Sequence, residues 1–384
     1  MYKRQQLRPV TNNNFTPIVR LGNTLELSFD DLDADNKEYQ YKIEHMTYDW
    51  QPSDLLPSQY ISGYESDYII NVTNSFNTLQ NYTHYSVTFP NNNTRITKSG
   101  NYLISVLNED DEVVFTRKCV IYEDKTTVGV SVVRSRDFKY INKKQTVNFT
   151  VNYNGITVRN PSQEIKTVLF QNNNWNTTIT GLQPQFFQQN QLIYNYVDKT
   201  NYWGGNEYLN FDTKNIRNTS QNIAQVQRKD LYHHYLFSDV PRGKRTYTYN
   251  PDINGNFVIR TLESDDENSE SDYAMMHFNL EVDFPYENKE VYVFGAFNNY
   301  NFSDENKMTY NLESKSYQLE IPLKQGFYNY GYATVDESEV DYTAIDGSFF
   351  ETENEYTVIV YYKPFGEIYD RVIGVGTGFF NQNR

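Results

Sequence analysis

Apolar and polar residues alternate over short stretches along the whole chain. Leu25, Leu27 and Phe29 alternate with polar residues, and a similar run follows around Ile104. Because successive side chains of a β-strand point to opposite faces, a period of two predicts strands with one buried face. Turn-forming stretches such as residues 108–111 separate these runs. We therefore expect many short strands, in the pattern that is typical of two-sheet sandwiches.

The composition supports the same fold class. The 384 residues include 35 Tyr and 24 Phe, whereas alanine is rare. Aromatic and β-branched side chains lose rotamer freedom in a helix and pack well on a pleated sheet. The sequence therefore predicts an all-β protein, with enough aromatic surface to build its cores.

The length suits two or three domains of about 100–150 residues each. The strand patterns fall into three groups, and the acidic, aromatic-free residues 263–272 are expected to form a mobile linker. We predict three consecutive β-sandwich domains of immunoglobulin-like or early-set type. Their expected bounds are residues 1–124, 125–268 and 269–384.

The charge balance excludes some classes of partner. The chain has 34 basic and 49 acidic residues, a formal net charge of -15. Nucleic acids and anionic membrane surfaces attract the opposite sign, so neither is expected to bind. No apolar run reaches the length of about 18 residues that would span a bilayer, and no membrane insertion is expected. Residues 1–6 show no signal-peptide pattern, which indicates either a cytoplasmic protein or a mature form.

The motifs of common catalytic and metal sites are missing from the sequence. Neither the zinc pattern HExxH, nor a CxxC pair, nor the nucleophile motif GxSxG occurs. The single Cys119 lies in a strand pattern and is expected to be a packed thiol, and the adjacent His233 and His234 should point to opposite faces. Turn chemistry accounts for residues 31–35 and 252–256, which contain Asp and Asn, better than calcium binding does. We expect no catalysis, no metal, no cofactor and no small-molecule substrate.

Aromatic residues are concentrated in the middle of the chain, where Tyr202 and Trp203 precede Gly204, Gly205 and Asn206. Glycines allow a tight turn, which would project the flanking aromatic residues from the surface. Tyr and Trp are frequent anchors of protein interfaces, so this segment is the candidate partner-binding site. The alternative is that Trp203 anchors the core of its own domain.

The C-terminal group of strands resembles the early-set β-sandwich modules that bind starch or glycogen. In those modules two aromatic residues stack on sugar, and Tyr300 and Tyr317 stand at or near the matching positions. The resemblance implies a candidate glycan-binding pair. It rests on residues 291–300, Met308, residues 317–323 and residues 326–330.

Five stretches of the sequence are distinctive, residues 6–9, 17–22, 39–50, 201–213 and 372–376. Through them, and over its whole length, the chain resembles the type IX secretion system plug proteins of Bacteroidetes. That family implies a non-enzymatic periplasmic protein, a monomer within a larger complex, with the outer-membrane translocon barrel as its partner. It would bind the periplasmic opening of the barrel and seal it when no secretion partner is engaged. The alternative function is a cell-envelope glycan-binding or esterase-associated β-sandwich protein.

Overall fold

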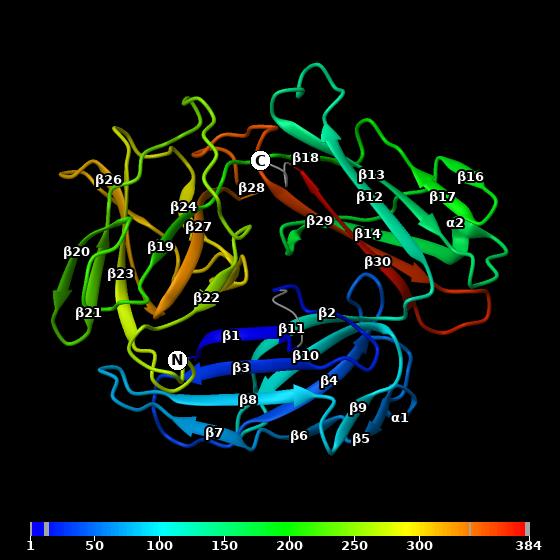
Figure 1. The fold of residues 1–384 in the computed structure, drawn as a ribbon, viewed down its shortest axis with the longest axis horizontal. Coiled ribbons are helices and arrows are strands. Elements are labelled where there is room, and N and C mark those ends of the chain that lie inside the picture. The colour runs from blue at the N-terminus through cyan, green and yellow to red at the C-terminus, as the bar shows by residue number, and fades with distance from the viewer. Residues whose placement is uncertain (1, 11–14, 338, 381–384) are drawn as a thin grey trace.

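A computed structural model describes residues 2–337 and 339–380 except for 11–14. Within them the chain is almost entirely β-strand, and its helices are the short α1 (Pro57–Tyr60), α2 (Pro161–Glu164) and the 3-10 turn η1 (Ala296–Asn298). The strands build three units that lie around a common centre (Figure 1). The predicted all-β sandwich architecture is confirmed. None of the helices in the described residues is long and apolar enough to cross a membrane.

The first unit, residues 2–123, is a two-sheet sandwich. Its core contains the alternating residues Leu27 and Phe29, and the Phe29 ring stacks on Tyr85 with the ring centroids 5.0 Å apart. One sheet has the order β1 (Tyr2–Pro9), β3 (Leu25–Asp31), β8 (Thr83–Phe89), β7 (Asn71–Asn74). The other has the order β2 (Ile18–Arg20), β11 (Val113–Tyr122), β10 (Gly100–Leu107), β4 (Gln40–Met46), β6 (Ser66–Tyr68). A small ribbon joins β5 (Ile61–Gly63) to β9 (Thr94–Ile96).

The middle unit consists of residues 126–203 and 354–380. Its sheets approach closely along β12 and β30, where a Cβ atom on Gly376 would lie 2.6 Å from the backbone oxygen of Val128. One sheet has the order β12 (Thr127–Arg134), β13 (Lys144–Asn152), β17 (Gln191–Tyr194), β16 (Phe186–Gln188), with β18 (Asn201–Trp203) also paired to β13. The other has the order β15 (Asn174–Ile179), β14 (Ile165–Gln171), β29 (Asn354–Tyr362), β30 (Arg371–Phe380).

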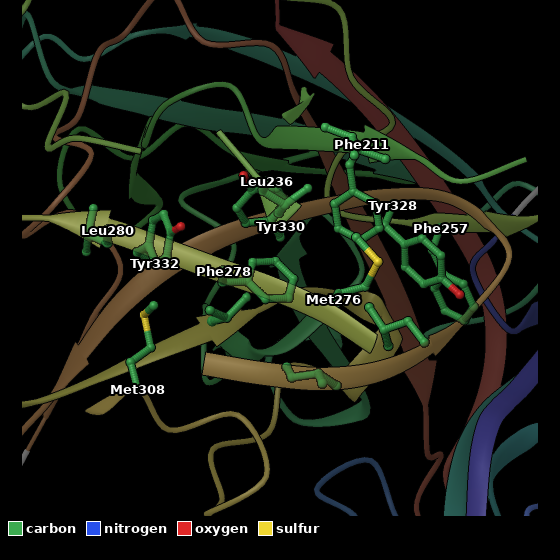
Figure 2. Packing of buried hydrophobic residues seen from close by; sticks show 14 of the residues in the cluster. Phe211, Leu236, Phe257, Met276, Phe278, Leu280, Met308, Tyr328, Tyr330 and Tyr332 are labelled. Atoms are coloured by element: carbon green, nitrogen blue, oxygen red, sulfur yellow. The ribbon is translucent and has the colours of Figure 1, made fainter. Parts of the chain in front are cut away.

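The third unit, residues 207–346, packs its aromatic side chains between two further sheets (Figure 2). Tyr328 stacks between Phe211 and Phe257, with centroid distances of 5.2 and 5.3 Å. In one sheet the long β27 (Gly326–Val335) pairs with β19 (Leu209–Asp212), β22 (Phe257–Ile259), β24 (Glu290–Phe294) and β28 (Val340–Asp341). The other has the order β20 (Ile223–Arg228), β21 (Tyr232–Leu236), β23 (Tyr273–Glu281), β26 (Ser316–Lys324), β25 (Thr309–Asn311).

The predicted boundary between the middle and third domains, at residues 268/269, does not follow the sheets. Strands β19 to β22 precede that boundary but pair within the third unit, whereas β29 and β30 follow it but complete a sheet of the middle unit. The third unit is therefore inserted into the middle one. Alternation identifies a strand but not its partner, and the pairing of β14 with β29 joins residues almost 200 positions apart.

Residues 263–272 were predicted to be a mobile linker, and this prediction is wrong. Ser269 and Ser271 are buried. The Tyr82 hydroxyl donates to the backbone oxygen of Ser271 (2.8 Å), and the Asp272 carboxylate accepts the backbone N–H of Leu79 (2.7 Å). The first unit thus supplies hydrogen-bond partners for this segment, which its acidic sequence without apolar residues does not reveal. The segment is held against the first unit and is not a mobile linker.

Contacts between all three pairs of units hold the molecule together. Apolar side chains of the first and middle units form one shared cluster, and Tyr361 donates a hydrogen bond to Asn101 across it (2.8 Å). The middle and third units meet where the Tyr300 hydroxyl donates to the backbone oxygen of Asn172 (3.1 Å). The members of the shared cluster are Ile18, Val120, Val168, Phe170, Ile359, Tyr361 and Val372.

Candidate functional site

The predicted partner-binding segment begins on β18, where two neighbouring aromatic residues face opposite ways. Tyr202 lies opposite the buried Gln145, and Trp203 lies opposite Lys144. Tyr202 belongs to the core of the middle unit, and its hydroxyl donates to the backbone oxygen of Leu169 (2.8 Å). The Trp203 side chain is 42% exposed, so the alternative that Trp203 anchors the core does not hold.

Trp203 is part of an exposed group that the sequence analysis missed. Its ring meets Tyr140 edge to face at 5.4 Å, and the Lys144 ammonium lies 4.2 Å from the Trp203 centroid and 4.4 Å from that of Tyr140. Phe138, on the same β12–β13 turn as Tyr140, is 92% exposed. We call Phe138, Tyr140, Lys144 and Trp203 the aromatic–lysine patch. The lysines at 139, 143 and 144 beside two aromatic residues were its signal in the sequence.

The rest of the segment does not project as the sequence analysis expected. Residues 204–206 belong to the loop that crosses from the middle unit into the third, beside the returning residues 346–354. Gly205 donates its N–H to Ser348 Oγ (3.1 Å) and accepts the N–H of Phe349 (2.8 Å), and Asn206 donates to the backbone oxygen of Asp346 (3.0 Å). A Cβ atom on Gly204 would lie 2.0 Å from the Phe349 oxygen, which explains the glycine.

Beside this crossing lies a cavity of about 430 Å³ between the middle and third units. Several of its charged residues are engaged with one another or with nearby hydroxyl groups. Arg242 Nε donates to Asp346 Oδ1 (2.8 Å), and the Tyr247 hydroxyl donates to Glu207, whose pKa is raised by burial. These groups stabilise the junction and do not form a nucleophile and base pair.

Tyr300 and Tyr317, the candidate glycan-binding pair, are only 3% and 5% exposed. The Tyr300 hydroxyl is bonded to the middle unit, and the Tyr317 hydroxyl accepts the backbone N–H of Tyr286 (2.8 Å). Stacking on sugar needs an exposed ring face. The expectation that these two residues stack on glycan is therefore wrong, because both rings are buried against other parts of the protein.

The acidic residues 31–35 bring Asp31, Asp33 and Asp35 close enough to hold a cation. The ammonium group of Lys37 already lies among them, 2.9 Å from Asp31 Oδ2 and 3.3 Å from Asp35 Oδ1, and it also pairs with Asp33. In the other acidic turn, Asp252 accepts the backbone N–H of Tyr208 (2.6 Å). Both groups have protein partners of their own.

Cys119 is a packed thiol, as predicted, and His234 is the buried member of the adjacent histidine pair. Both are fully buried, and burial raises the pKa of the Cys119 thiol to about 12, which removes the nucleophilic thiolate at neutral pH. His234 pairs through Nε2 with the backbone oxygen of Ile216 (2.9 Å), and burial lowers its pKa to about 4. The neighbouring His233 points the other way, toward His277 (2.8 Å between ring nitrogens).

A buried charge cluster joins the first and third units, and no sequence motif pointed to it. Asp30 Oδ2 accepts hydrogen bonds from Lys324 Nζ (2.8 Å) and from the Tyr273 hydroxyl (2.7 Å), while Oδ1 pairs with His84 Nδ1 (2.6 Å). Burial tends to raise the pKa of Asp30, but Lys324 and His84 outweigh it and hold that pKa well below its ordinary value of 3.8. Asp30 is therefore ionised and ties the two units together.

Comparisons with known proteins agree with this architecture. Residues 3–123 match the family model described as the first domain of the type 9 secretion system plug protein. A crystal structure of a hypothetical protein from Parabacteroides merdae is 32% identical and has a TM-score of 0.94, covering 98% of this chain and 97% of that one. No curated protein matches the chain. The first unit belongs to the type 9 secretion system plug protein family as its first domain, and this match supports a role in type IX secretion.

Proposed function

We propose that this protein is a non-enzymatic plug that binds the periplasmic opening of the outer-membrane translocon barrel and closes it when no secretion partner is engaged. The observation that carries the proposal is the match of the first unit to the plug family, within a chain whose three units are fixed to one another. A plug needs bulk and a reversible docking surface, and both are compatible with this architecture. Its place of action would be the periplasm.

The aromatic–lysine patch is the docking surface we favour. It combines an aromatic pair with an adjacent cation at the end of a β-hairpin. Exposed aromatic residues are common interface anchors, and loops carried by rigid sheets are the usual place for them. Lys144 and its neighbouring lysines give this patch a positive charge on an acidic protein, which favours an acidic rim on the barrel.

The test is co-purification of the tagged protein with the translocon from native outer membranes. We expect the double substitution Phe138→Ala with Trp203→Ala to lose about 2 kcal/mol or more of binding free energy. The melting temperature should stay close to that of the parent, because both side chains are exposed. The matched control is Phe365→Ala, which removes a fully exposed aromatic residue elsewhere on the middle unit and should bind normally.

Sealing is measured separately from docking. Cells without the protein should admit a large hydrophilic antibiotic that the outer membrane normally excludes, and the parent protein should restore exclusion. Normal exclusion without the protein would contradict the sealing role. If the double variant is stable and still co-purifies with the translocon, the aromatic–lysine patch is not the docking surface.

A further inference from the structure

The three units enclose a cavity of about 480 Å³ at their common junction, within the range of about 300–1,000 Å³ that is usual for ligand sites. The first unit contributes Arg8, Arg117 and Lys118 to its wall, the middle unit Asn173 and neighbouring residues, and the third unit Asn299 and neighbouring residues. Two glutamines and six asparagines line it in all, and none of the described lining residues is acidic. A cationic, carboxylate-free cavity is unexpected in a chain with a net charge of -15.

Arg117 is fixed in this wall with its charge uncompensated. Its guanidinium donates to the backbone oxygens of Thr116 (2.7 Å) and Gln5 (3.2 Å), which hold it in place. Burial lowers the pKa of Arg117 to about 10. No Asp or Glu among the described residues forms an ion pair with Arg117 or Lys118. A positive charge removed from water without an anion is costly, so the site favours a negatively charged occupant.

A second guanidinium, that of Arg4, lies nearby and donates through Nη2 to Asn268 Oδ1 (2.7 Å). A smaller cavity of about 250 Å³ shares Gln5, Arg117 and Phe257 with the first, and Arg4 lines it. Arg4 is only 8% exposed. Its Nε and Nη1 atoms have no hydrogen-bond partner among the described residues. Buried donors are normally satisfied, so these two atoms leave room for acceptors supplied by a ligand.

The shape of the wall favours an extended peptide over a sugar. Strand β11 pairs with β10 along its length, but with β2 only at residues 120–122, so the edge at residues 115–118 faces the cavity without a strand partner among the described residues. Such an edge and the surrounding side-chain amides complement peptide N–H and C=O groups. Two of the lining rings are already stacked on other side chains, Trp175 on Phe170 (4.5 Å) and Phe257 on Tyr328 (5.3 Å).

We infer that the junction cavity binds the C-terminal end of an extended peptide, with the terminal carboxylate beside Arg117 and the peptide backbone along the edge of β11. This inference concerns a ligand inside the molecule and does not depend on the plug role proposed above.

The test is calorimetric binding of acetyl-tetraalanine with a free carboxylate to the full chain, compared with the C-terminal amide of the same peptide. We expect the carboxylate form to bind at least about tenfold more tightly. Arg117→Gln and Lys118→Gln should each remove most of that preference. Lys118 is exposed and its replacement should fold normally, which keeps the test valid if Arg117→Gln does not fold. Arg95→Gln, an exposed arginine of the first unit outside both cavities, is the matched control.

Equal binding of the carboxylate and the amide, or binding of neither at millimolar concentration, would overturn the inference. So would a carboxylate preference that survives both substitutions in folded protein. Tighter binding of trigalacturonate than of the peptide would overturn the peptide assignment and identify an acidic sugar instead.

Discussion

At the scale of single residues, two adjacent aromatic side chains on β18 have opposite roles. Pairing with β13 turns Tyr202 into the core and Trp203 toward solvent. The pleat of the strand thus separates a residue that stabilises the fold from one that is free to bind a partner.

We expect Tyr202→Ala to lower the free energy of unfolding by about 3–5 kcal/mol, because it removes a buried ring and leaves a cavity. Trp203→Ala should change it by less than about 1 kcal/mol, since its main contacts are exposed ones with Tyr140 and Lys144. Denaturant unfolding of both variants checks this. Equal losses of unfolding free energy in the two variants would mean that the Trp203 ring stabilises the fold as much as the Tyr202 ring does.

At the scale of elements, the crossing segment depends on two glycines for different reasons. Gly204 makes room for the returning backbone at Phe349, whereas Gly205 has a φ of +65° and open space around it.

We therefore expect Gly204→Ala to cost about 3 kcal/mol or more, because the returning backbone at Phe349 must move. Gly205→Ala should cost only about 1 kcal/mol of backbone strain. Thermal unfolding of the two variants provides the comparison, and a larger loss for Gly205→Ala would contradict the geometry described here.

The strands themselves could be predicted from the sequence, whereas their partners could not. Alternation at Leu25, Leu27 and Phe29 located β3, because its apolar side chains share the face toward the core and polar ones occupy the other face. Nothing local distinguishes a β29 that pairs with β14 from one that pairs with β27. For the same reason the sequence pointed to Trp203 but not to Tyr140 beside it. It also gave no sign that Arg4, Arg117 and Asn299 line the same cavity.

At the scale of the whole molecule, the insertion of the third unit makes the middle unit discontinuous. A fragment of residues 125–268 would lack β29 and β30, and with them much of its second sheet. We expect this fragment to remain unfolded by circular dichroism and proteolysis. A fragment that joins residues 125–203 to 354–380 by a short glycine–serine linker should regain β structure, and a folded 125–268 fragment would contradict the observed pairing.

The Asp30 cluster makes the attachment of the first unit to the third dependent on pH. Because the pKa of Asp30 is lower in the folded protein than in the unfolded chain, its stabilisation is complete above about pH 4 and is lost as the pH falls further. Asp30→Asn should lower the free energy of unfolding by about 3–5 kcal/mol at neutral pH, since Lys324 stays buried without its carboxylate. It should also make the free energy of unfolding depend less on pH below about pH 4. Urea unfolding at pH 2–7 tests both effects, and Asp111→Asn, at an exposed turn, is the control.

The late position of β29 and β30 also sets an order of events during biogenesis. The middle unit begins at residue 126, yet its second sheet waits for strands near the end of the chain. Because the N-terminal residues are synthesised first, the first unit can fold early. The edge of β14 that pairs with β29 has no strand partner until the last few dozen residues have been synthesised. Exposed edges attract other chains, so this interval is when the nascent protein most needs a chaperone.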